Sequence, residues 1–222
     1  MEIQRSDTER SLPNRQEPSL LLSTGQTLAM KVITTFYRRL VLLERAMVPP
    51  PPMPVVPSPV EIGCVDISTD LTDLSTFRPS LSTKSILERL DRGEKCFAVW
   101  IDGRIVHTAW VAVHRARVEY LSSDIELEKD DIYIFDSYTT AEFRGLHLAR
   151  ARAAFVASYY SVRGFRRSLG LVAVENRAGL AVPEALGYRR IGRYSALGIG
   201  RWRRTWSKPL PGEDIPLLVR MA

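Results

Sequence analysis

Apolar and polar residues change their spacing several times along the chain, and each change predicts a new element. Runs rich in β-branched and aromatic residues predict strands or hairpins over 60–67, 96–113, 118–121, 131–139, 168–174 and 189–206. Apolar residues three and four positions apart predict helices over 82–93, 144–164 and 178–187. This order predicts a mixed, largely antiparallel α+β domain with one strand–helix–strand crossover over 131–174.

Turn and cap residues support these boundaries. Asp102 and Gly103 form a pair suited to the positive φ angles of a tight hairpin turn inside 96–113. Ser82 is placed to cap the helix over 82–93, and Gly93 to end it. Gly164 is expected to end the helix that begins at residue 144.

The first 59 residues differ in composition from the rest. Residues 1–18 are polar, and a disordered tail is expected over 1–25. Over 26–46 the apolar residues recur near helical spacing and predict an amphipathic helix: Leu28, Val32, Phe36, Leu40 and Leu43. Consecutive prolines then predict an extended arm up to residue 59. We therefore expect one medium-sized globular domain over 60–208, followed by a C-terminal tail over 209–222.

Composition narrows the class of protein. The 222 residues are 45% hydrophobic and 25% charged, as in a soluble globular domain. Cys64 and Cys96 lie in separate apolar runs and are expected to be reduced core residues. Three histidines without metal-ligand spacing predict no metal. The chain shows no signal-peptide pattern and no membrane-spanning run, so a cytoplasmic protein is expected.

The stretch "IYIFDSYTTAEFRGLHLARARAAF" (132–155) runs from an apolar strand through a glycine-containing turn into a helix. Free N–H groups and the positive end of the helix dipole at such a turn attract phosphate groups. His147 stands where a second glycine would ease the turn, but its main-chain N–H remains available. The alternative is an ordinary strand–turn–helix in which Gly145 only permits a tight turn.

Two motifs in this order resemble the GNAT superfamily of acyl-CoA-dependent N-acyltransferases, over about residues 60–206. The first is "RGLHLA", which is similar to the family's Arg/Gln-x-x-Gly-x-Gly/Ala loop between a strand and a helix. The second, "VAVENRAGLAVPEALGYRRIGRY", is similar to the family's strand ending in asparagine, short helix and Leu-Gly-Tyr. The resemblance implies a GNAT-like fold and acetyl-CoA, or another acyl-CoA, as cosubstrate.

The resemblance also assigns the cofactor contacts. The loop residues would hold the pyrophosphate: Arg144, Gly145, Leu146, His147, Leu148 and Ala149. Main-chain groups near Tyr138 and Thr139 would bind the pantetheine arm, and Asn176 would help to position the cofactor. An amine would then attack the thioester directly within a ternary complex.

Candidate catalytic residues come from the strands. Strand alternation places Asp136 and Tyr138 on the same face as Ile134, and Ser137 on the face of Phe135. A carboxylate in line with apolar residues needs a partner or a chemical role, so Asp136 is the first candidate for the base. Pairing with an arginine for structural reasons is the alternative. His107 is the second candidate, against a hydrogen-bonded core histidine. The family's tyrosine acid would fall at Pro183. Water, Tyr138 or one of the helix residues Tyr159 and Tyr160 could replace it, or the thiolate could leave without an acid.

The segment 189–208 carries seven basic residues and no acidic one, with three aromatic residues among them. It could bind an anionic sugar nucleotide or glycan precursor, or nucleic acid, or be the exposed face of a terminal hairpin. The helix over 26–46 could pack on the domain, mediate a homodimer or lie on a membrane surface. A weaker similarity to bacterial acyltransferases linked to surface-polysaccharide synthesis suggests an amino sugar as acceptor.

Three other functional classes remain open. A module with this fold that has lost its acid would bind acyl-CoA without turnover. A nucleic-acid binder would depend steeply on salt and little on coenzyme A. An aminoacyl-tRNA-dependent relative of the fold would not need the phosphate loop.

Overall fold

An eight-stranded sheet with the order β10-β9-β1-β8-β7-β4-β3-β2 organises the protein. The computed structural model describes residues 37–56, 59–199 and 202–220. The strands of this sheet are β1 (Tyr37–Ala46), β2 (Glu61–Cys64), β3 (Lys95–Ile101), β4 (Arg104–Val113), β7 (Asp131–Thr139), β8 (Arg167–Ala173), β9 (Arg189–Ile199) and β10 (Trp202–Pro209). A second, three-stranded sheet has the order β11-β6-β5, with β5 (Arg115–Val118), β6 (Ser123–Glu126) and β11 (Leu217–Arg220).

The helices connect these strands. They are α2 (Ile67–Phe77), α3 (Thr83–Asp91), α4 (Leu148–Ser161) and α5 (Arg177–Ala185), with single 3₁₀ turns η1 (Glu119–Leu121) and η2 (Ala141–Phe143). Neighbouring strands of the large sheet are antiparallel except β7 and β8, which are parallel and joined by α4. The predicted α+β class and the single crossover are therefore confirmed.

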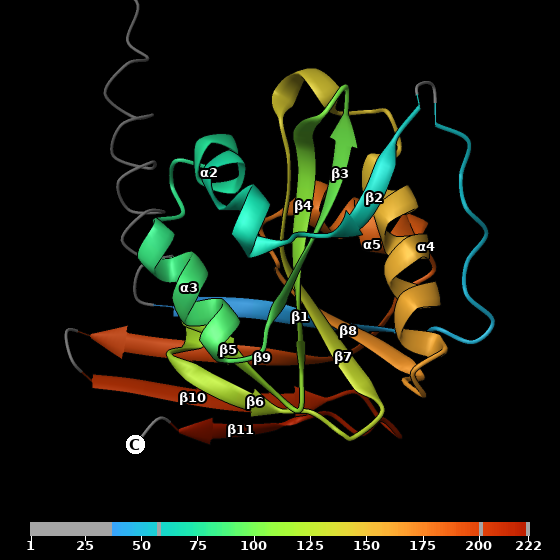
Figure 1. Cartoon of the computed structure of the whole chain (residues 1–222). Coiled ribbons are helices and arrows are strands. Elements are labelled where there is room, and N and C mark those ends of the chain that lie inside the picture. The colour runs from blue at the N-terminus through green and yellow to red at the C-terminus, as the bar shows by residue number, and fades with distance from the viewer. Residues whose placement is uncertain (1–36, 57–58, 200–201, 221–222) are drawn as a thin grey trace, which may run out of the picture. The chain divides into compact units, whose positions relative to one another are not determined.

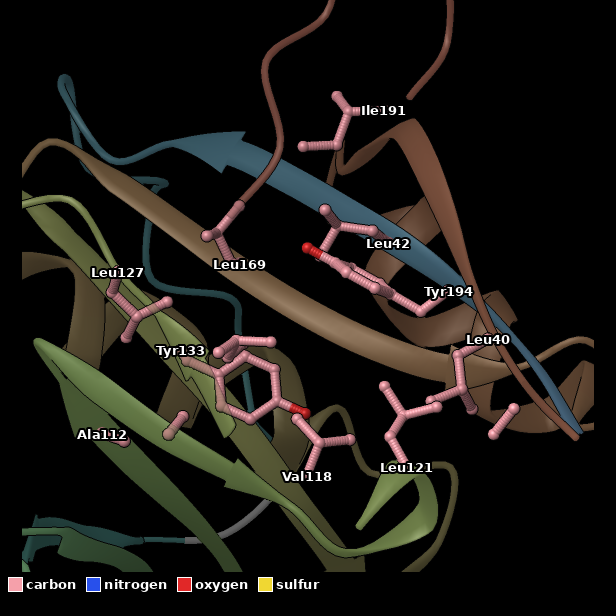
Figure 2. Packing of buried hydrophobic residues seen from close by; sticks show 13 residues of the cluster. Leu40, Leu42, Ala112, Val118, Leu121, Leu127, Tyr133, Leu169, Ile191 and Tyr194 are labelled. Atoms are coloured by element: carbon pink, nitrogen blue, oxygen red, sulfur yellow. The ribbon is translucent and has the colours of Figure 1, made fainter. Parts of the chain in front are cut away.

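Both faces of the large sheet are covered. Helix α4 packs on one face, where Val156 and Tyr160 meet Val111 and Ile132, and α5 covers β1 on the same side through Leu180. Helices α2 and α3 lie on the opposite face, as Figure 1 shows. The three-stranded sheet also packs on that opposite face. Figure 2 shows its side chains facing those of the large sheet across a buried apolar cluster.

The prediction of a helix over 26–46 is wrong for residues 37–46, and residues 26–36 lie outside the described ranges. Residues 37–46 form β1, which pairs with β8 on one side and β9 on the other. The four residues from Leu40 to Leu43 are all buried, because both faces of a central strand are covered. This segment is therefore no membrane-surface helix, and the sheet extends beyond the boundaries 60–208 expected for the domain.

Other details also differ from expectation. Only Val118 of the strand predicted over 118–121 is in a strand, and the next three residues form η1. Cys64 is exposed, whereas Cys96 is buried as expected; both are free thiols. The segment expected to be a tail over 209–222 contributes β11, which pairs with β6.

Local predictions that rested on turn chemistry are confirmed. Asp102 and Gly103 have φ of 49° and 72° in the turn between β3 and β4. The side chain of Ser82 accepts a hydrogen bond from the N–H of Ser85 at the start of α3. None of the helices in the described ranges is long and apolar enough to cross a membrane.

Candidate functional site

Strands β7 and β8 separate soon after they begin, and this opens the large sheet. They pair only from Asp131 to Tyr133, opposite Arg167 to Leu169. Beyond these residues each strand keeps its outer neighbour, β4 for β7 and β1 for β8. The parallel pair therefore diverges toward the start of α4, and its inner edges are left without a strand partner there.

A cavity of about 430 Å³ occupies this opening. On the face that carries α4 and α5 it is lined by Ala149, Arg152, Ala153, Asn176 and Pro183, among others. On the opposite face Val118, Tyr120 and Tyr133 line it. The cavity thus passes through the sheet between β7 and β8, and we call it the cleft.

A β-bulge in β7 shapes one wall of the cleft. Trp110 of β4 pairs with Phe135 and Thr108 pairs with Tyr138, so two residues of β7 oppose one of β4. Asp136 sits at this bulge with φ of 51°, a conformation that aspartate tolerates better than most residues. The ladder is interrupted here, and main-chain groups are released from pairing beside the cleft.

The bulge also changes which side chains share a face. Simple alternation predicted Asp136 and Tyr138 beside Ile134, and Ser137 beside Phe135. Instead Tyr138 packs edge-on against Phe77 of α2, on the side opposite α4. Ser137 accepts a hydrogen bond from Arg152 of α4. The inserted residue shifts the alternation by one position, so the expectation is wrong beyond the bulge.

The loop before α4 presents unused main-chain donors. In the described part of the chain, the N–H groups of residues 145–149 donate to no acceptor. Gly145 has φ of 84° and His147 has φ of 58°, so two left-handed residues turn the chain into the helix. His147 is the N-cap residue of α4 and makes no side-chain cap hydrogen bond. Successive free N–H groups at a helix N-terminus form an anion-binding cradle.

The side chains of this loop have separate positions. Leu148 is 2% exposed and packs with Val99 and Val106, which anchors the start of the helix. Leu146 packs against the same cluster. The Arg144 side chain is exposed and donates to the main-chain carbonyl of Thr139 at 3.3 Å. The predicted cofactor loop is therefore assembled next to the end of β7, although its role remains a prediction.

His107 lies on β4, is fully buried and is not among the residues that line the cleft. Its Nε2 accepts a hydrogen bond from Nε of Arg152 at 3.3 Å, so its Nδ1 carries the proton and donates to Oγ1 of Thr139 at 2.8 Å. Burial, and next the charge of Arg152, lower the His107 pKa well below 6.5. A neutral histidine fixed in this way positions Thr139, which lines the cleft. The geometry favours the hydrogen-bonded core interpretation over a catalytic base.

Asp136 lies between two guanidinium groups on the side opposite α4. Arg89 donates to its Oδ2 at 2.6 Å, and Arg78 donates to its Oδ1. Because both oxygens already accept charge-assisted hydrogen bonds, the carboxylate is poorly placed to remove a proton from an amine. Of the two interpretations of Asp136, the geometry favours structural pairing with arginine.

The tyrosines named as alternative acids do not line the cleft. Tyr138 faces α2, while Tyr159 and Tyr160 pack with Phe97 under α4. Pro183, the position expected for the acid, does line the cleft.

Other phenols line it that the sequence did not single out as candidate acids: Tyr120, Tyr133 and the motif residue Tyr188. Burial raises the pKa of Tyr133, so its hydroxyl keeps its proton. Tyr133 was missed because an aromatic residue in an apolar strand is typical of the core.

Asn176 is both a cleft residue and a helix cap. Its Oδ1 accepts a hydrogen bond of 2.8 Å from the N–H of Gly179 in the first turn of α5. A Cβ on Gly179 would lie 2.4 Å from Nδ2 of Asn176, so glycine is needed for this cap geometry. The asparagine therefore fixes the edge of the cleft formed by α5.

The basic segment 189–208 is partly neutralised. Arg189 pairs with Glu44 and Glu213, and Arg190 pairs with Glu184. These ion pairs tie the hairpin to β1, to α5 and to the segment before β11. They favour the exposed face of a hairpin among the interpretations of this segment.

No family model and no curated protein sequence matches this chain. A solved GCN5-related N-acetyltransferase from Sphaerobacter thermophilus is 17% identical, with a TM-score of 0.52, over 85% of this chain and 58% of that one. The aminoglycoside 6'-N-acetyltransferase AAC(6')-Ih from Acinetobacter baumannii is 14% identical, with a TM-score of 0.48, over 59% and 91%. The aminoglycoside N-acetyltransferase AAC(6')-Iy, solved with CoA, is 20% identical, with a TM-score of 0.46, over 58% and 91%.

At 17% identity the Sphaerobacter structure establishes the fold alone, which is GNAT-like. The Sphaerobacter structure carries this assignment, and the present chain spans 58% of its length.

Proposed function

We propose that this protein transfers an acyl group, most simply acetyl, from acyl-CoA to an amine. The observation that carries the proposal is the cleft between β7 and β8, which opens beside five unused N–H groups of the α4 cradle. The fold shared with the Sphaerobacter N-acetyltransferase supports it.

The residues fit the groups of coenzyme A. The cradle N–H groups over 145–149 bind the pyrophosphate through hydrogen bonds and the helix dipole. The small side chains of Ala149 and Ala153 on α4 leave room for the pantetheine arm in the cleft. Asn176 holds α5 at the other wall. Thr139, fixed by His107, faces the arm from β7.

The thioester supplies an activated acyl carbon. The amine nitrogen forms a bond to this carbon, the carbon–sulfur bond breaks, and the nitrogen loses a proton while the thiolate gains one. The bulge at Asp136 offers a released main-chain N–H to the carbonyl oxygen as charge develops. The hydroxyl of Tyr133, which burial keeps protonated because it raises the pKa, lies in the cleft on the side opposite the cradle and stabilises the leaving thiolate by donating a hydrogen bond to it, while the amine proton reaches the thiolate through water.

The acceptor enters from the side opposite α4. Arg78 and Arg89 contact Asp136 of the cleft wall on this side, and Arg38 lies 4.6 Å from the ring centre of the cleft residue Tyr120. Arginines at this mouth favour an acceptor that carries an anionic group beside its amine. An amino sugar nucleotide or a related glycan precursor has this chemistry.

Calorimetric titration with acetyl-CoA tests the cradle. Two double variants are compared, and each changes an Arg-Gly pair to Glu-Asp, one pair before α4 and the other after it. Arg144→Glu with Gly145→Asp places two negative charges in the cradle. The matched control, Arg163→Glu with Gly164→Asp, changes the other Arg-Gly pair, where Gly164 also has a positive φ of 90°. We expect the first pair to abolish binding and the control to retain it. Failure of the folded wild type to bind acetyl-CoA would refute the proposal.

A binding module without turnover is the second candidate, and Pro183 in the cleft wall favours it. Screening of amine acceptors by release of free thiol separates the two functions. The enzyme predicts turnover that Tyr133→Phe lowers at least about 10-fold without weakening acetyl-CoA binding. The module predicts binding alone.

A further inference from the structure

Arg152 is a buried cation that faces the cleft. It lies on the second turn of α4, is 4% exposed, and lines the cavity beside Ala149 and Ala153. Helical side chains point back toward the N-terminus, so its guanidinium lies near the level of the cradle.

Its protein partners are neutral. Nε donates to Nε2 of His107 at 3.3 Å, and Nη2 donates to Oγ of Ser137 at 3.3 Å. None of the carboxylates in the described residues forms an ion pair with it. Burial lowers the Arg152 pKa to about 10, the direction expected of a guanidinium without a counter-ion.

A guanidinium has five N–H donors, and the two hydrogen bonds above leave donors on the cleft side. Arg89, which is also buried, pairs with Asp136, and the partly buried Arg167 pairs with Asp131. Burying an unpaired charge is costly, and an apolar side chain would fill the same space without that cost. The missing negative charge therefore belongs to whatever occupies the cleft.

We propose that Arg152 binds an oxyanion inside the cleft, and that His107 and Ser137 hold its guanidinium in position for this role. The proposal rests on the proposed function for the identity of the ligand. Two sources share the chemistry: a phosphate of coenzyme A, or a carboxylate at the end of the acyl group, as in succinyl-CoA. The planar guanidinium suits either group, because it binds phosphate and carboxylate with paired hydrogen bonds.

The anion site of Arg152 is tested first with two free anions that are not attached to coenzyme A. Thermal unfolding is followed with added inorganic pyrophosphate and, separately, with succinate. Arg152→Gln removes the charge and keeps an N–H donor, and Arg163→Gln removes a charge from the exposed end of the same helix as control. We expect at least one anion to raise the unfolding temperature of the wild type and of Arg163→Gln, with the shift lost in Arg152→Gln. An equal shift in Arg152→Gln, or none in the wild type, would overturn the proposal.

Calorimetry with CoA, acetyl-CoA and succinyl-CoA then identifies the source of the oxyanion. Loss of about 10-fold or more in the affinity of Arg152→Gln for all three ligands assigns it to a coenzyme A phosphate. A similar loss for succinyl-CoA alone assigns it to an acyl carboxylate. A wild type that is stabilised by the anions through Arg152 but binds none of the three ligands refutes the acyltransferase and leaves the anion site. Unchanged affinities for all three in Arg152→Gln count against the site.

Discussion

Asp131 accepts two hydrogen bonds of 2.6 Å from the guanidinium of Arg167, where β7 and β8 still pair. The carboxylate is buried, with 1% of its side chain exposed. Arg167 also donates to Glu44 of β1 at 3.4 Å, so one guanidinium joins three neighbouring strands. This contact closes the sheet at the end of the cleft that lies away from the cradle, and it limits how far the two strands separate.

Asp131→Asn tests this closure. Removing one partner leaves the Arg167 guanidinium partly buried without its main acceptor, and we expect the free energy of unfolding to fall by about 3 kcal/mol. Urea denaturation at neutral pH measures the change. The control is Asp130→Asn, because Asp130 contributes its main-chain carbonyl to Arg166 and Arg167 rather than a side-chain ion pair. Equal stabilities of the two variants would show that the ion pair does not hold the strands.

The sequence predicted the crossover over 131–174 because two apolar strands flank a helix with clear stop signals. It could not predict β1 from Leu40 to Leu43, since a short continuous apolar run suits a buried strand and a buried helix equally. The two are distinguished only by β8 and β9, which come more than a hundred residues later and cover both edges.

Some features of the candidate site could also be predicted from the sequence, and others could not. The turn over 144–149 into α4 was predictable, because glycine and a helix start are local signals. The bulge at Asp136 was not, because it depends on the register against β4. Arg152 carries no local signal either: an arginine on a helix is usually solvated, and its burial is decided by how α4 packs on β7.

Asp136→Asn distinguishes a structural carboxylate from a catalytic base. Asparagine also tolerates the left-handed conformation at this bulge, so the change mainly removes the charge between Arg78 and Arg89. We expect a loss of about 3 kcal/mol in the free energy of unfolding, because Arg89 is buried and loses its partner.

In the Arg89→Met background the same change should cost at least about 1 kcal/mol less, as measured by a double-mutant cycle. A stable Asp136→Asn variant that binds acetyl-CoA but turns over at least about 100-fold more slowly would instead identify Asp136 as the base.

His147→Gly tests whether the cradle acts through its main chain. The imidazole makes no cap hydrogen bond, and φ of 58° strains a residue with a Cβ. Glycine removes this strain, so we expect stability to change by no more than about 1 kcal/mol, in the stabilising direction. Acetyl-CoA affinity should stay within about 3-fold, since the N–H remains. A loss of binding would show that the imidazole contacts the phosphates. Urea denaturation and calorimetry measure the two effects.

His107 makes stability depend on pH in the acidic range. The unfolded histidine titrates near 6.5, whereas burial and Arg152 keep the folded residue neutral at lower pH, because its pKa is well below that value. Below pH 6.5 the unfolded state therefore binds more protons, and stability falls as pH falls, by up to about 1.4 kcal/mol per pH unit.

The His107→Gln variant should lack this contribution of His107 to the pH dependence of stability. We expect the difference in unfolding free energy between pH 7 and pH 5.5 to be smaller in the variant by about 1 kcal/mol. Identical pH profiles for the two proteins would mean that His107 has the same pKa in the folded and unfolded states.

The effect of Gly179→Ala on the free energy of unfolding should depend on the residue at position 176. In the wild type an added Cβ would lie 2.4 Å from Nδ2 and 2.7 Å from Cγ of Asn176, so the cap must move. Loss of the cap costs about 1 kcal/mol and cancels or exceeds the gain in helix propensity. In the Asn176→Ala background no cap is left to displace, and Gly179→Ala should stabilise α5 by about 0.5 to 1 kcal/mol. Urea denaturation of the four proteins measures the cycle. The same stabilisation in both backgrounds would mean that the two side chains do not compete for space at this edge of the cleft.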